Sequence, residues 1–335
     1  MPIKVLHVGL GPIGVAILRQ VAGHAGCVAV GAVDIDPSKG GRDLGEVAHL
    51  RRRLGATVTA DLAASIKSLS PDIAIVSTTS SLRQAQPTFE TLLRAKIPIV
   101  STTEELVAPV KAHAAIAKRL DAMAKRARVA ILGTGVNPGF VMDALPIALT
   151  GVCASVSAID VDRVQDARIR RVPFQRKIGA GLTPEEFAAA VKAGTVRHVG
   201  LAESVTMIAD AMGWKLDRIV DEIHPKIAEV AVTGGAVAVA AGQVAGLVQD
   251  GIGYRKGKAL VRLHMEAYLG APESYDAIRI VGNPPLSVKF DGGVHGDIAT
   301  ASIVVNSIPK VLQAPPGLRT MRDMVLPSIF PGGKR

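Results

Sequence analysis

The sequence predicts an α/β protein in which a doubly wound parallel sheet is followed by an α+β domain with a mainly antiparallel sheet. Three observations predict this fold class. Apolar, strand-like runs alternate with helix-like segments up to about residue 150, and a glycine-rich turn joins the first strand to the first helix. Later runs are rich in β-branched residues and are separated by turn pairs. We place the domains at 1–145 and 146–295, and expect 296–335 to return to the first domain.

The first βαβ unit predicts a Rossmann dinucleotide-binding domain. Its strands, 3–8 and 28–33, flank a helix that begins at Pro12 within the run Gly9–Gly14. The second strand ends in Asp34, where this fold places the acid that binds the adenosine ribose. The first glycine of the run permits a tight turn, the second lets the backbone approach the pyrophosphate, and the third lets the helix pack on the strand. The helix N-terminus then offers N–H groups to the phosphates.

The choice between NAD and NADP stays open from these residues. Asp34 can accept hydrogen bonds from both ribose hydroxyls and would repel a 2′-phosphate, which favours NAD. Lys39 and Arg42 either bind that phosphate, if their loop bends back, or are solvated, so we expect dual use. The residues expected to bind the cofactor are Gly9, Gly11, Pro12, Ile13, Gly14, Asp34, Lys39, Arg42, Ser77, Thr78, Thr102, Asn137 and Asn306.

The remaining elements follow in order. In the first part we expect strands at 57–59, 73–77, 98–101 and 129–132, and helices at 42–53, 61–68, 82–96 and 109–126, the last with Pro109 in its first turn. In the second part we expect a strand at 155–161, helices at 183–193, opened by a capping box, and 202–212, and strands at 218–223, 228–233, 243–252, 260–267, 277–281 and 286–290. A long apolar helix is expected at 296–312. Ligand groups should lie past the carboxyl ends of the parallel strands.

Composition excludes several functions. The net charge is +10, but the basic residues are scattered, and we interpret the one tight run, 51–53, as a solvated helix face. Only ten aromatic residues are present, so we expect no nucleic-acid partner.

Cys27 and Cys153 lie in apolar surroundings without zinc-binding spacing, so we expect no metal, two buried thiols and a cytoplasmic location. The uncharged stretch 230–249 contains a Gly-Gly pair and predicts two buried strands rather than a membrane span.

Two segments that follow strands carry candidate chemistry. Glu104, just past 98–101, can bind an ammonium or iminium and pass a proton, or it can simply favour the first turn of the next helix. The loop 133–143 holds three glycines, an Asn and a Pro within seven residues, as expected either of close approach to a ligand or of a domain crossing. His198 can face a substrate or be structural, and His295 to Asp297 is interpreted mainly as a helix cap.

Together these segments resemble the 2,4-diaminopentanoate dehydrogenases and related native amine dehydrogenases, whose fold is similar to that of dihydrodipicolinate reductase. The matching pieces are 9–14, 101–106, 133–143, 198–204 and 296–301 with 306–309. Two positions depart from the family pattern: Thr103 stands where a Cys is expected, and Arg197 where a Gly is expected.

The resemblance implies an oxidoreductase that reversibly deaminates a primary amine or diamino acid to a carbonyl compound, through an iminium and with NAD or NADP. It implies that Glu104 is the catalytic acid and that the protein is a homodimer joined through the second domain. The substrate-binding residues implied are Glu105, Asn137, Pro138, Phe140 and His198.

Two other functions remain open from the residues alone. One is an ammonia-independent dehydrogenase or reductase of a hydroxy or cyclic imine substrate on the same scaffold. The other is a nucleotide-sensing regulator, which would need neither Glu104 nor a second glycine loop. Also open is whether a substrate carboxylate is bound by Arg168, Arg170, Arg171 or Arg176.

Overall fold

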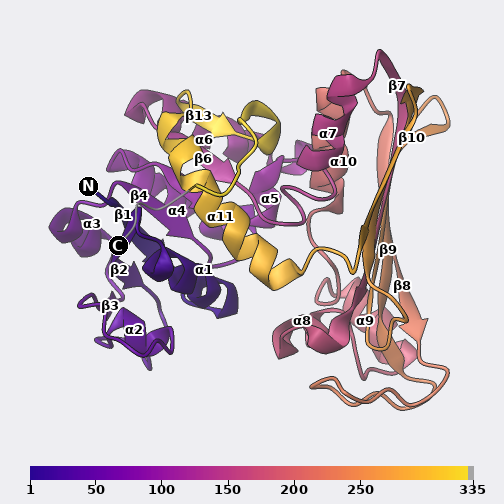
Figure 1. Ribbon diagram of the computed structural model, residues 1–335, viewed down its shortest axis with the longest axis horizontal. Coiled ribbons are helices and arrows are strands. Elements are labelled where there is room, and N and C mark those ends of the chain that lie inside the picture. Colours follow the sequence, from indigo (N-terminus) through magenta and orange to yellow (C-terminus); the bar gives the residue numbers. More distant parts are fainter. Residues whose placement is uncertain (331–335) are drawn as a thin grey trace. The chain divides into compact units, whose positions relative to one another are not determined.

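The computed structural model describes residues 1–330 and divides the chain into two compact units (Figure 1). Unit 1 comprises Met1–Phe140 and the segment that begins at Asp297. Unit 2 comprises Val141–Gly296. The α/β fold class predicted from the sequence is confirmed: unit 1 is built on a parallel sheet and unit 2 on a mainly antiparallel one.

The sheet of unit 1 is parallel in every pairing and has the order β13-β6-β5-β4-β1-β2-β3. All its strands therefore present their carboxyl ends to one edge, where a doubly wound fold places its ligand. The strands are β1 Ile3–Val8, β2 Cys27–Val33, β3 Val58–Thr59, β4 Ile73–Val76, β5 Ile99–Ser101, β6 Ala130–Gly133 and β13 Gly317–Arg319.

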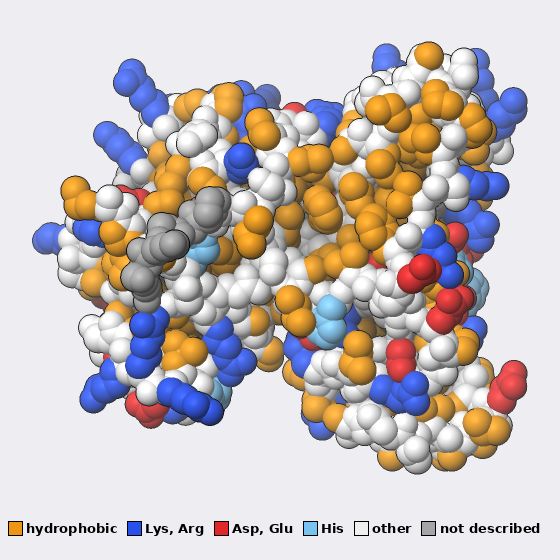
Figure 2. Space-filling view, in the orientation of Figure 1, with side chains coloured by type: hydrophobic (Ala, Val, Ile, Leu, Met, Phe, Trp, Pro, Cys, Tyr) orange, Lys and Arg blue, Asp and Glu red, His pale blue; other side chains and the backbone are white. Residues whose placement is uncertain are grey.

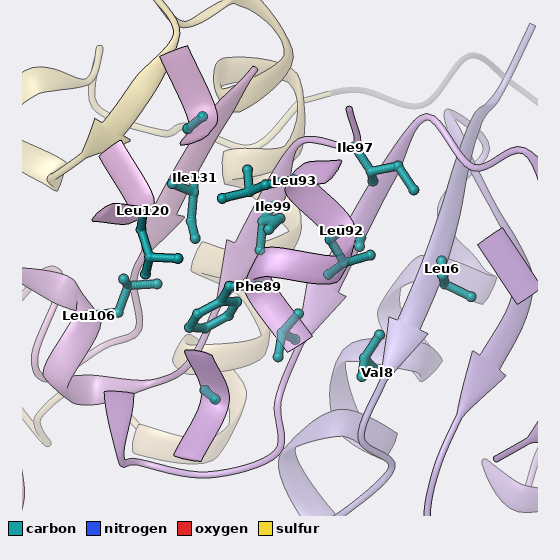
Figure 3. Close-up of a cluster of buried hydrophobic side chains, with 14 of the residues drawn as sticks. Leu6, Val8, Phe89, Leu92, Leu93, Ile97, Ile99, Leu106, Leu120 and Ile131 are labelled. Atoms are coloured by element: carbon teal, nitrogen blue, oxygen red, sulfur yellow. The ribbon is translucent and has the colours of Figure 1, made fainter. Parts of the chain in front are cut away.

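Helices cover both faces of this sheet. One face packs on α3, α4 and α6 through an apolar cluster around Phe89, which Leu6 and Val8 of β1 join from the sheet (Figure 3). On the other face, α1 and α11 contact each other through Gln20 and Ser302. The helices are α1 Pro12–Gly23, α2 Leu44–Val47, α3 Leu62–Leu69, α4 Leu82–Arg94, α5 Glu104–Val107, α6 Ala114–Ala127 and α11 Gly296–Gln313, with 3-10 turns at Lys111–His113 and Met321–Asp323.

The sheet of unit 2 has the order β12-β11-β7-β10-β9-β8, and all its pairings are antiparallel except β7 with β10. The strands are β7 Ser155–Asp166, β8 Arg218–Ile227, β9 Val244–Arg255, β10 Lys258–Tyr268, β11 Tyr275–Asn283 and β12 Leu286–Asp291. The helices are α7 Ala144–Leu149, α8 Val172–Lys177, α9 Pro184–Lys192 and α10 Leu201–Ala211, with 3-10 turns at Thr150–Val152 and Ala167–Ile169.

Unit 2 buries one face of its sheet under these helices, which lie on one side of it in Figure 1. Alternate residues of β10 accordingly point into an apolar core. The capping box predicted at the start of α9 is confirmed, with Thr183 and Glu186 satisfying each other's backbone N–H groups.

The helix predicted at 42–53 is wrong beyond its first turn. Only Leu44–Val47 is helical. The buried Asp43 carboxylate caps the start of this helix through the Gly45 N–H, and it also accepts the N–H groups of Leu54 and Gly55, which closes the following segment into a loop. The basic run 51–53 is exposed but lies in this loop, so its interpretation as a helix face is corrected. Across the view of Figure 2, Lys and Arg side chains are dispersed over the surface.

Three further predictions need correction. The helix expected at 109–126 begins at Ala114, after a 3-10 turn, so Pro109 is not in its first turn. The stretch 228–233 forms only an isolated bridge, Val232 with Val239, and most of 229–242 is exposed rather than a pair of buried strands. Cys153 is half-buried rather than buried. Among residues 1–330, no helix is long and apolar enough to cross a membrane.

Candidate cofactor and active site

The glycine run closes the β1–α1 junction tightly and leaves one open point. Gly9 has a φ of +91°, and a Cβ there would stand 2.6 Å from the Ser77 carbonyl oxygen. Ser77 in turn donates its hydroxyl to the Gly9 carbonyl at 2.9 Å. A Cβ on Gly14 would collide with the same carbonyl, whereas a Cβ on Gly11 would meet no described atom within 4 Å. The backbone at Gly11 is therefore accessible to a ligand.

The N-terminus of α1 is suited to an anion. Gly11 is its N-cap residue and makes no side-chain cap, Pro12 occupies the first turn, and no acidic residue is present there. Uncapped N–H groups at the positive end of a twelve-residue helix bind phosphate well. With the open backbone at Gly11, the first turn of α1, including Ile13, fits the pyrophosphate of a dinucleotide.

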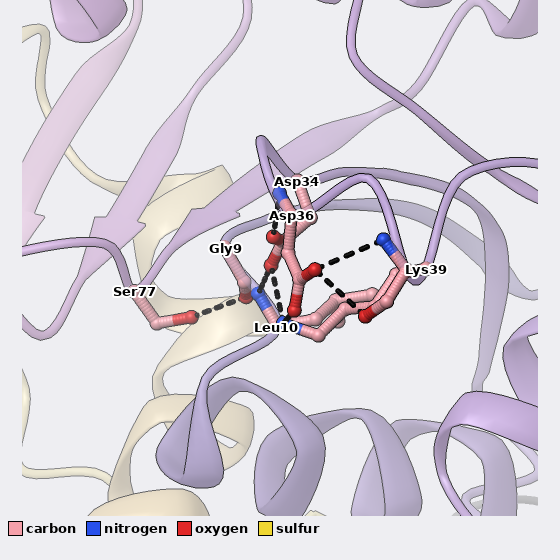
Figure 4. A network of polar contacts seen from close by, with 7 residues as sticks. Gly9, Leu10, Asp34, Asp36, Lys39 and Ser77 are labelled. Carbon is pink, nitrogen blue, oxygen red and sulfur yellow. Dashed lines mark hydrogen bonds and ion pairs between the residues drawn. The ribbon is translucent and has the colours of Figure 1, made fainter.

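Asp34, at the end of β2, is held in place by its surroundings (Figure 4). Its Oδ2 accepts the Leu10 N–H at 2.6 Å, and its Oδ1 accepts the Asp36 N–H at 2.9 Å. Lys39 lies 3.3 Å from both Asp34 and Asp36. The carboxylate is thereby fixed next to the glycine run, at the point where an adenosine ribose would bind.

The two cations predicted near Asp34 have different partners in the structure. Lys39 lies beside the Asp34 carboxylate, whereas Arg42 pairs through its Nε with Glu46 at 2.9 Å. Thr78, which follows Ser77 beyond β4, packs its methyl group beside Gly9.

Glu104 begins α5, directly after β5. Two buried hydroxyl groups fix the turn before Glu104 through hydrogen bonds. Thr103 donates its hydroxyl to the Thr79 carbonyl at 2.9 Å, and Ser101 lies 3.1 Å from that hydroxyl and accepts the Thr103 N–H. Thr102 donates its N–H to the Val76 carbonyl on β4. Since β5 lies two strands from β1, Glu104 stands about 10 Å along the sheet edge from the glycine run.

Glu105 has a structural contact of its own. Its Oε2 accepts the Leu82 N–H at the start of α4, at 2.8 Å, and lies 3.4 Å from Nε2 of His113. The carboxylate therefore joins α5 to α4.

The loop after β6 is compact. Within it, the Asn137–Pro138 peptide bond is cis, and a Cβ on Gly139 would stand 2.8 Å from the Gly135 carbonyl oxygen. The Val136 N–H reaches the Thr300 hydroxyl on α11. Pro138 is buried, while the side chains of Asn137 and Phe140 are partly exposed. Asn306 is also partly exposed and lies farther along α11.

In unit 2, one buried side chain, that of Gln249, hydrogen-bonds to both backbone polar groups of His198. Gln249 of β9 accepts the His198 N–H and donates to its carbonyl, both at 2.9 Å. Sequence reasoning missed Gln249, as it missed Ser101 and Thr103 in unit 1. A polar residue at an inward position of a strand is the signal that marks Gln249. Among residues 1–330, no group of three or more His, Cys, Asp or Glu side chains is arranged to hold a metal ion.

The chain is similar to known proteins over 99% of its length. A family model for the C-terminal domain of 2,4-diaminopentanoate dehydrogenase matches residues 140–335. The chain is 31% identical to 2,4-diaminopentanoate dehydrogenase of Acetoanaerobium sticklandii over 99% of this chain and 96% of that protein. The structure of an amine dehydrogenase from Mycobacterium smegmatis superposes with a TM-score of 0.87 at 23% identity, covering 99% and 98% of the two chains. A dihydrodipicolinate reductase from Paenisporosarcina sp. TG-14 gives a TM-score of 0.53 at 13% identity, covering 97% and 100%.

Proposed function

The chain belongs to the 2,4-diaminopentanoate dehydrogenase family, and we propose that it interconverts a primary amine and a carbonyl compound. It is an oxidoreductase that acts on amine groups and uses a nicotinamide cofactor. In the oxidative direction, a protonated amine, an oxidised cofactor and water give a carbonyl compound, ammonium, the reduced cofactor and a proton. The observation that carries the proposal is the position of Glu104 on the same sheet edge as the dinucleotide-binding run.

The residues of unit 1 provide the cofactor site. The first turn of α1, with Gly11, Pro12 and Ile13, would bind the pyrophosphate, and Asp34 would bind the adenosine ribose. Thr78 and Thr102, which follow β4 and β5, would lie toward the nicotinamide, as would Asn137 and Asn306. When bound, the cofactor accepts or donates the hydride.

Glu104 would act on the nitrogen. Its carboxylate would accept a hydrogen bond from the substrate ammonium and take a proton from it, which leaves the neutral amine that is oxidised. Once this proton, the one released in the overall reaction, has passed to solvent, the carboxylate would stabilise the cationic iminium. It then transfers a proton between the attacking water and the leaving ammonia. Asn137, Pro138, Phe140 and His198 would contact the substrate, with Glu105 beside the catalytic acid.

We favour NAD as the cofactor, with NADP accepted. The fixed carboxylate of Asp34 disfavours a 2′-phosphate by repulsion, and Arg42 is engaged with Glu46. Lys39 lies beside Asp34, so its positive charge would offset the repulsion between Asp34 and the 2′-phosphate of NADP.

We also propose a homodimer formed through the sheet of unit 2. The face of this sheet opposite the helices carries polar and charged side chains that pair across neighbouring strands, including Asp160 with Arg279 and His264 with Asp250. Sedimentation velocity of the purified protein would give twice the chain mass. A monomer at micromolar concentration would contradict this proposal.

The direct test of function is ammonia-dependent oxidation of the reduced cofactor, followed at 340 nm over a panel of ketones and aldehydes. Consumption of NADH or NADPH only in the presence of ammonia is the expected result. Turnover that does not depend on ammonia would instead indicate a dehydrogenase or reductase of a hydroxy or cyclic imine substrate. Tight cofactor binding without any turnover would favour a nucleotide sensor.

The role of Glu104 is tested by Glu104→Gln, which keeps the shape and removes the base. Turnover should fall about 10²- to 10⁴-fold, while cofactor affinity measured by fluorescence titration is retained. Glu185→Gln is the matched control, because Glu185 is an exposed acid in the first turn of α9. Activity of the Glu104 variant equal to that of the control would refute the assignment.

A further inference from the structure

Cationic side chains from α4, α6 and the turn after α4 converge on a pocket of unit 1. The pocket has a volume of about 530 Å³, a size that suits a small metabolite. Every charged residue in its lining is a lysine or an arginine. The lining residues are Leu93, Arg94, Lys96, Arg119, Met123, Arg126 and Ala127.

The pocket lies at the edge of the sheet opposite the proposed cofactor site. Because β4, β5 and β6 are parallel, the helices that connect them lead back from the carboxyl edge to the amino edge. Arg94 ends α4, Lys96 follows it, and Arg126 is in the last turn of α6. Asp34 and Glu104 instead follow the carboxyl ends of β2 and β5. A ligand in this pocket would therefore bind apart from the dinucleotide and from the proposed catalytic acid.

One carboxylate orients two of the four cations. Glu90 of α4 accepts Nε and Nη2 of Arg119 at 2.7 and 3.0 Å, and Nη2 of Arg94 at 2.7 Å. Hydrogen bonds from Arg119 and Gln86 hold the pKa of Glu90 below its usual range. Each guanidinium has five N–H donors, so both arginines keep donors for a ligand.

The other two cations have no acidic partner. The side chains of Lys96 and Arg126 are exposed, and neither makes a hydrogen bond or ion pair with another residue in the range 1–330. A cation at the end of a helix is favourable by itself, because the last carbonyl groups carry partial negative charge. Here cations from two helices meet at one pocket, and their charge exceeds that of Glu90. A bound anion would neutralise the excess.

The pocket also presents apolar surface. Met123 lies one turn beyond Arg119 on the same face of α6, and Ala127 lies one turn further on. Both are partly buried, and Met123 packs against the apolar cluster around Phe89. A flexible thioether adapts to the shape of an apolar ligand group. The lining thus suits a molecule with an anionic end and an apolar body.

We propose that this pocket binds an organic phosphate, with the phosphate group on Lys96 and Arg126 and the apolar part on Met123. Arginine binds phosphate through its forked N–H donors, and lysine binds it as a point charge. A phosphate monoester carries about two negative charges at pH 7, so it matches several cations better than a carboxylate does. This binding site is independent of the proposed amine dehydrogenase function.

The experiment is a calorimetric titration of the full-length protein with 1-naphthyl phosphate. NAD is present at saturating concentration, so that the dinucleotide site is filled. Wild type should bind the probe, whereas inorganic phosphate and 1-naphthol, which each carry half of its chemistry, should bind about tenfold more weakly or less. Replacing both Lys96→Gln and Arg126→Gln should weaken binding of the probe about 10- to 100-fold, the loss expected for charge-assisted contacts.

The matched control replaces both Arg83→Gln and Lys118→Gln. It removes the same charges from the same two helices, at exposed positions outside the pocket. At about 0.1 M salt, where long-range attraction is largely screened, it should bind the probe like wild type. Far-UV circular dichroism of both double variants should match that of wild type, because all four side chains are exposed.

Three results would overturn the proposal. Equal weakening in both double variants would mean that the probe is attracted to the basic protein as a whole. Binding of inorganic phosphate or of 1-naphthol as tight as that of the probe would mean that the pocket does not select an organic phosphate. No binding of the probe in the presence of NAD would mean that the dinucleotide site had been its only site.

Discussion

His7 provides a test of the fold that does not depend on the function. It lies in the centre of β1, is completely buried, and its two ring nitrogens find no hydrogen-bond partner among residues 1–330. Burial without a partner disfavours the charged imidazolium, and it lowers the pKa of His7 to about 4 from 6.5. The folded state therefore excludes a proton that the unfolded state binds.

The size and sign of the effect follow from that difference. The folded-state pKa lies below the unfolded one, so protonation of His7 does not change the free energy of unfolding at pH values well above 6.5. As the pH falls from 6.5 toward 4, the unfolded state takes up the proton and stability is lost. His7 alone should reduce the free energy of unfolding by about 2 kcal/mol at pH 5 and about 3 kcal/mol below pH 4.

The perturbation is His7→Leu, which replaces the ring with an apolar side chain of similar size. Urea unfolding at pH 7.5 and pH 5.0, followed by far-UV circular dichroism, measures the change. The variant should be less sensitive than wild type to this drop in pH, by about 2 kcal/mol. Circular dichroism is required because the single tryptophan, Trp214, belongs to unit 2, whereas His7 belongs to unit 1.

His224→Gln is the matched control, since His224 is exposed on β8. It should follow wild type at both pH values. Equal losses of stability between pH 7.5 and 5.0 in wild type and His7→Leu would refute the reasoning. That result would mean that His7 is protonated within the fold or reaches water.

Other changes have outcomes that the contacts determine. Thr103→Val removes the hydroxyl bonded to the Thr79 carbonyl; it should cost about 1–3 kcal/mol in urea unfolding and lower kcat by loosening the turn before the proposed catalytic acid, with the KM for the cofactor unchanged. Asp276→Asn leaves Arg163 as an uncompensated buried cation and should cost about 3–5 kcal/mol, measured by tryptophan fluorescence in urea. Asp34→Ser removes the charge that repels a 2′-phosphate, so the ratio of kcat/KM for NADP over NAD should rise about tenfold or more, a change of ~1.4 kcal/mol.

The parts of the fold predicted from sequence are those whose cause is local. The strand, glycine turn and helix from Ile3 to Gly23 are specified by adjacent residues, and the structure has the elements where the pattern indicated them. The same holds for α9, whose capping box lies within four residues. For such segments, propensity and hydrogen bonding point to one conformation.

The errors have a common physical origin in contacts between distant residues. Asp43 holds the segment after α2 in a loop by accepting N–H groups eleven and twelve positions away, which no helical periodicity reveals. The short strand β13 was not predicted, because Gly317–Arg319 becomes a strand only by pairing with Ala130–Leu132 of β6. The buried ion pair of Arg163 with Asp276 can likewise be recognised only once the register of β7 and β11 is known.

Glycine gives the clearest case of a residue type whose meaning depends on the structure. Both glycine-rich segments suggested close approach of the backbone to a ligand. In the loop after β6, Gly139 is required because its Cα faces the backbone of Gly135, so packing within the loop explains it. At the start of α1, Gly9 and Gly14 are also explained by packing, but Gly11 faces space that no described atom fills. The features that favour a bound dinucleotide are therefore the open backbone at Gly11, the uncapped helix N-terminus behind it and the fixed carboxylate of Asp34, rather than the number of glycines.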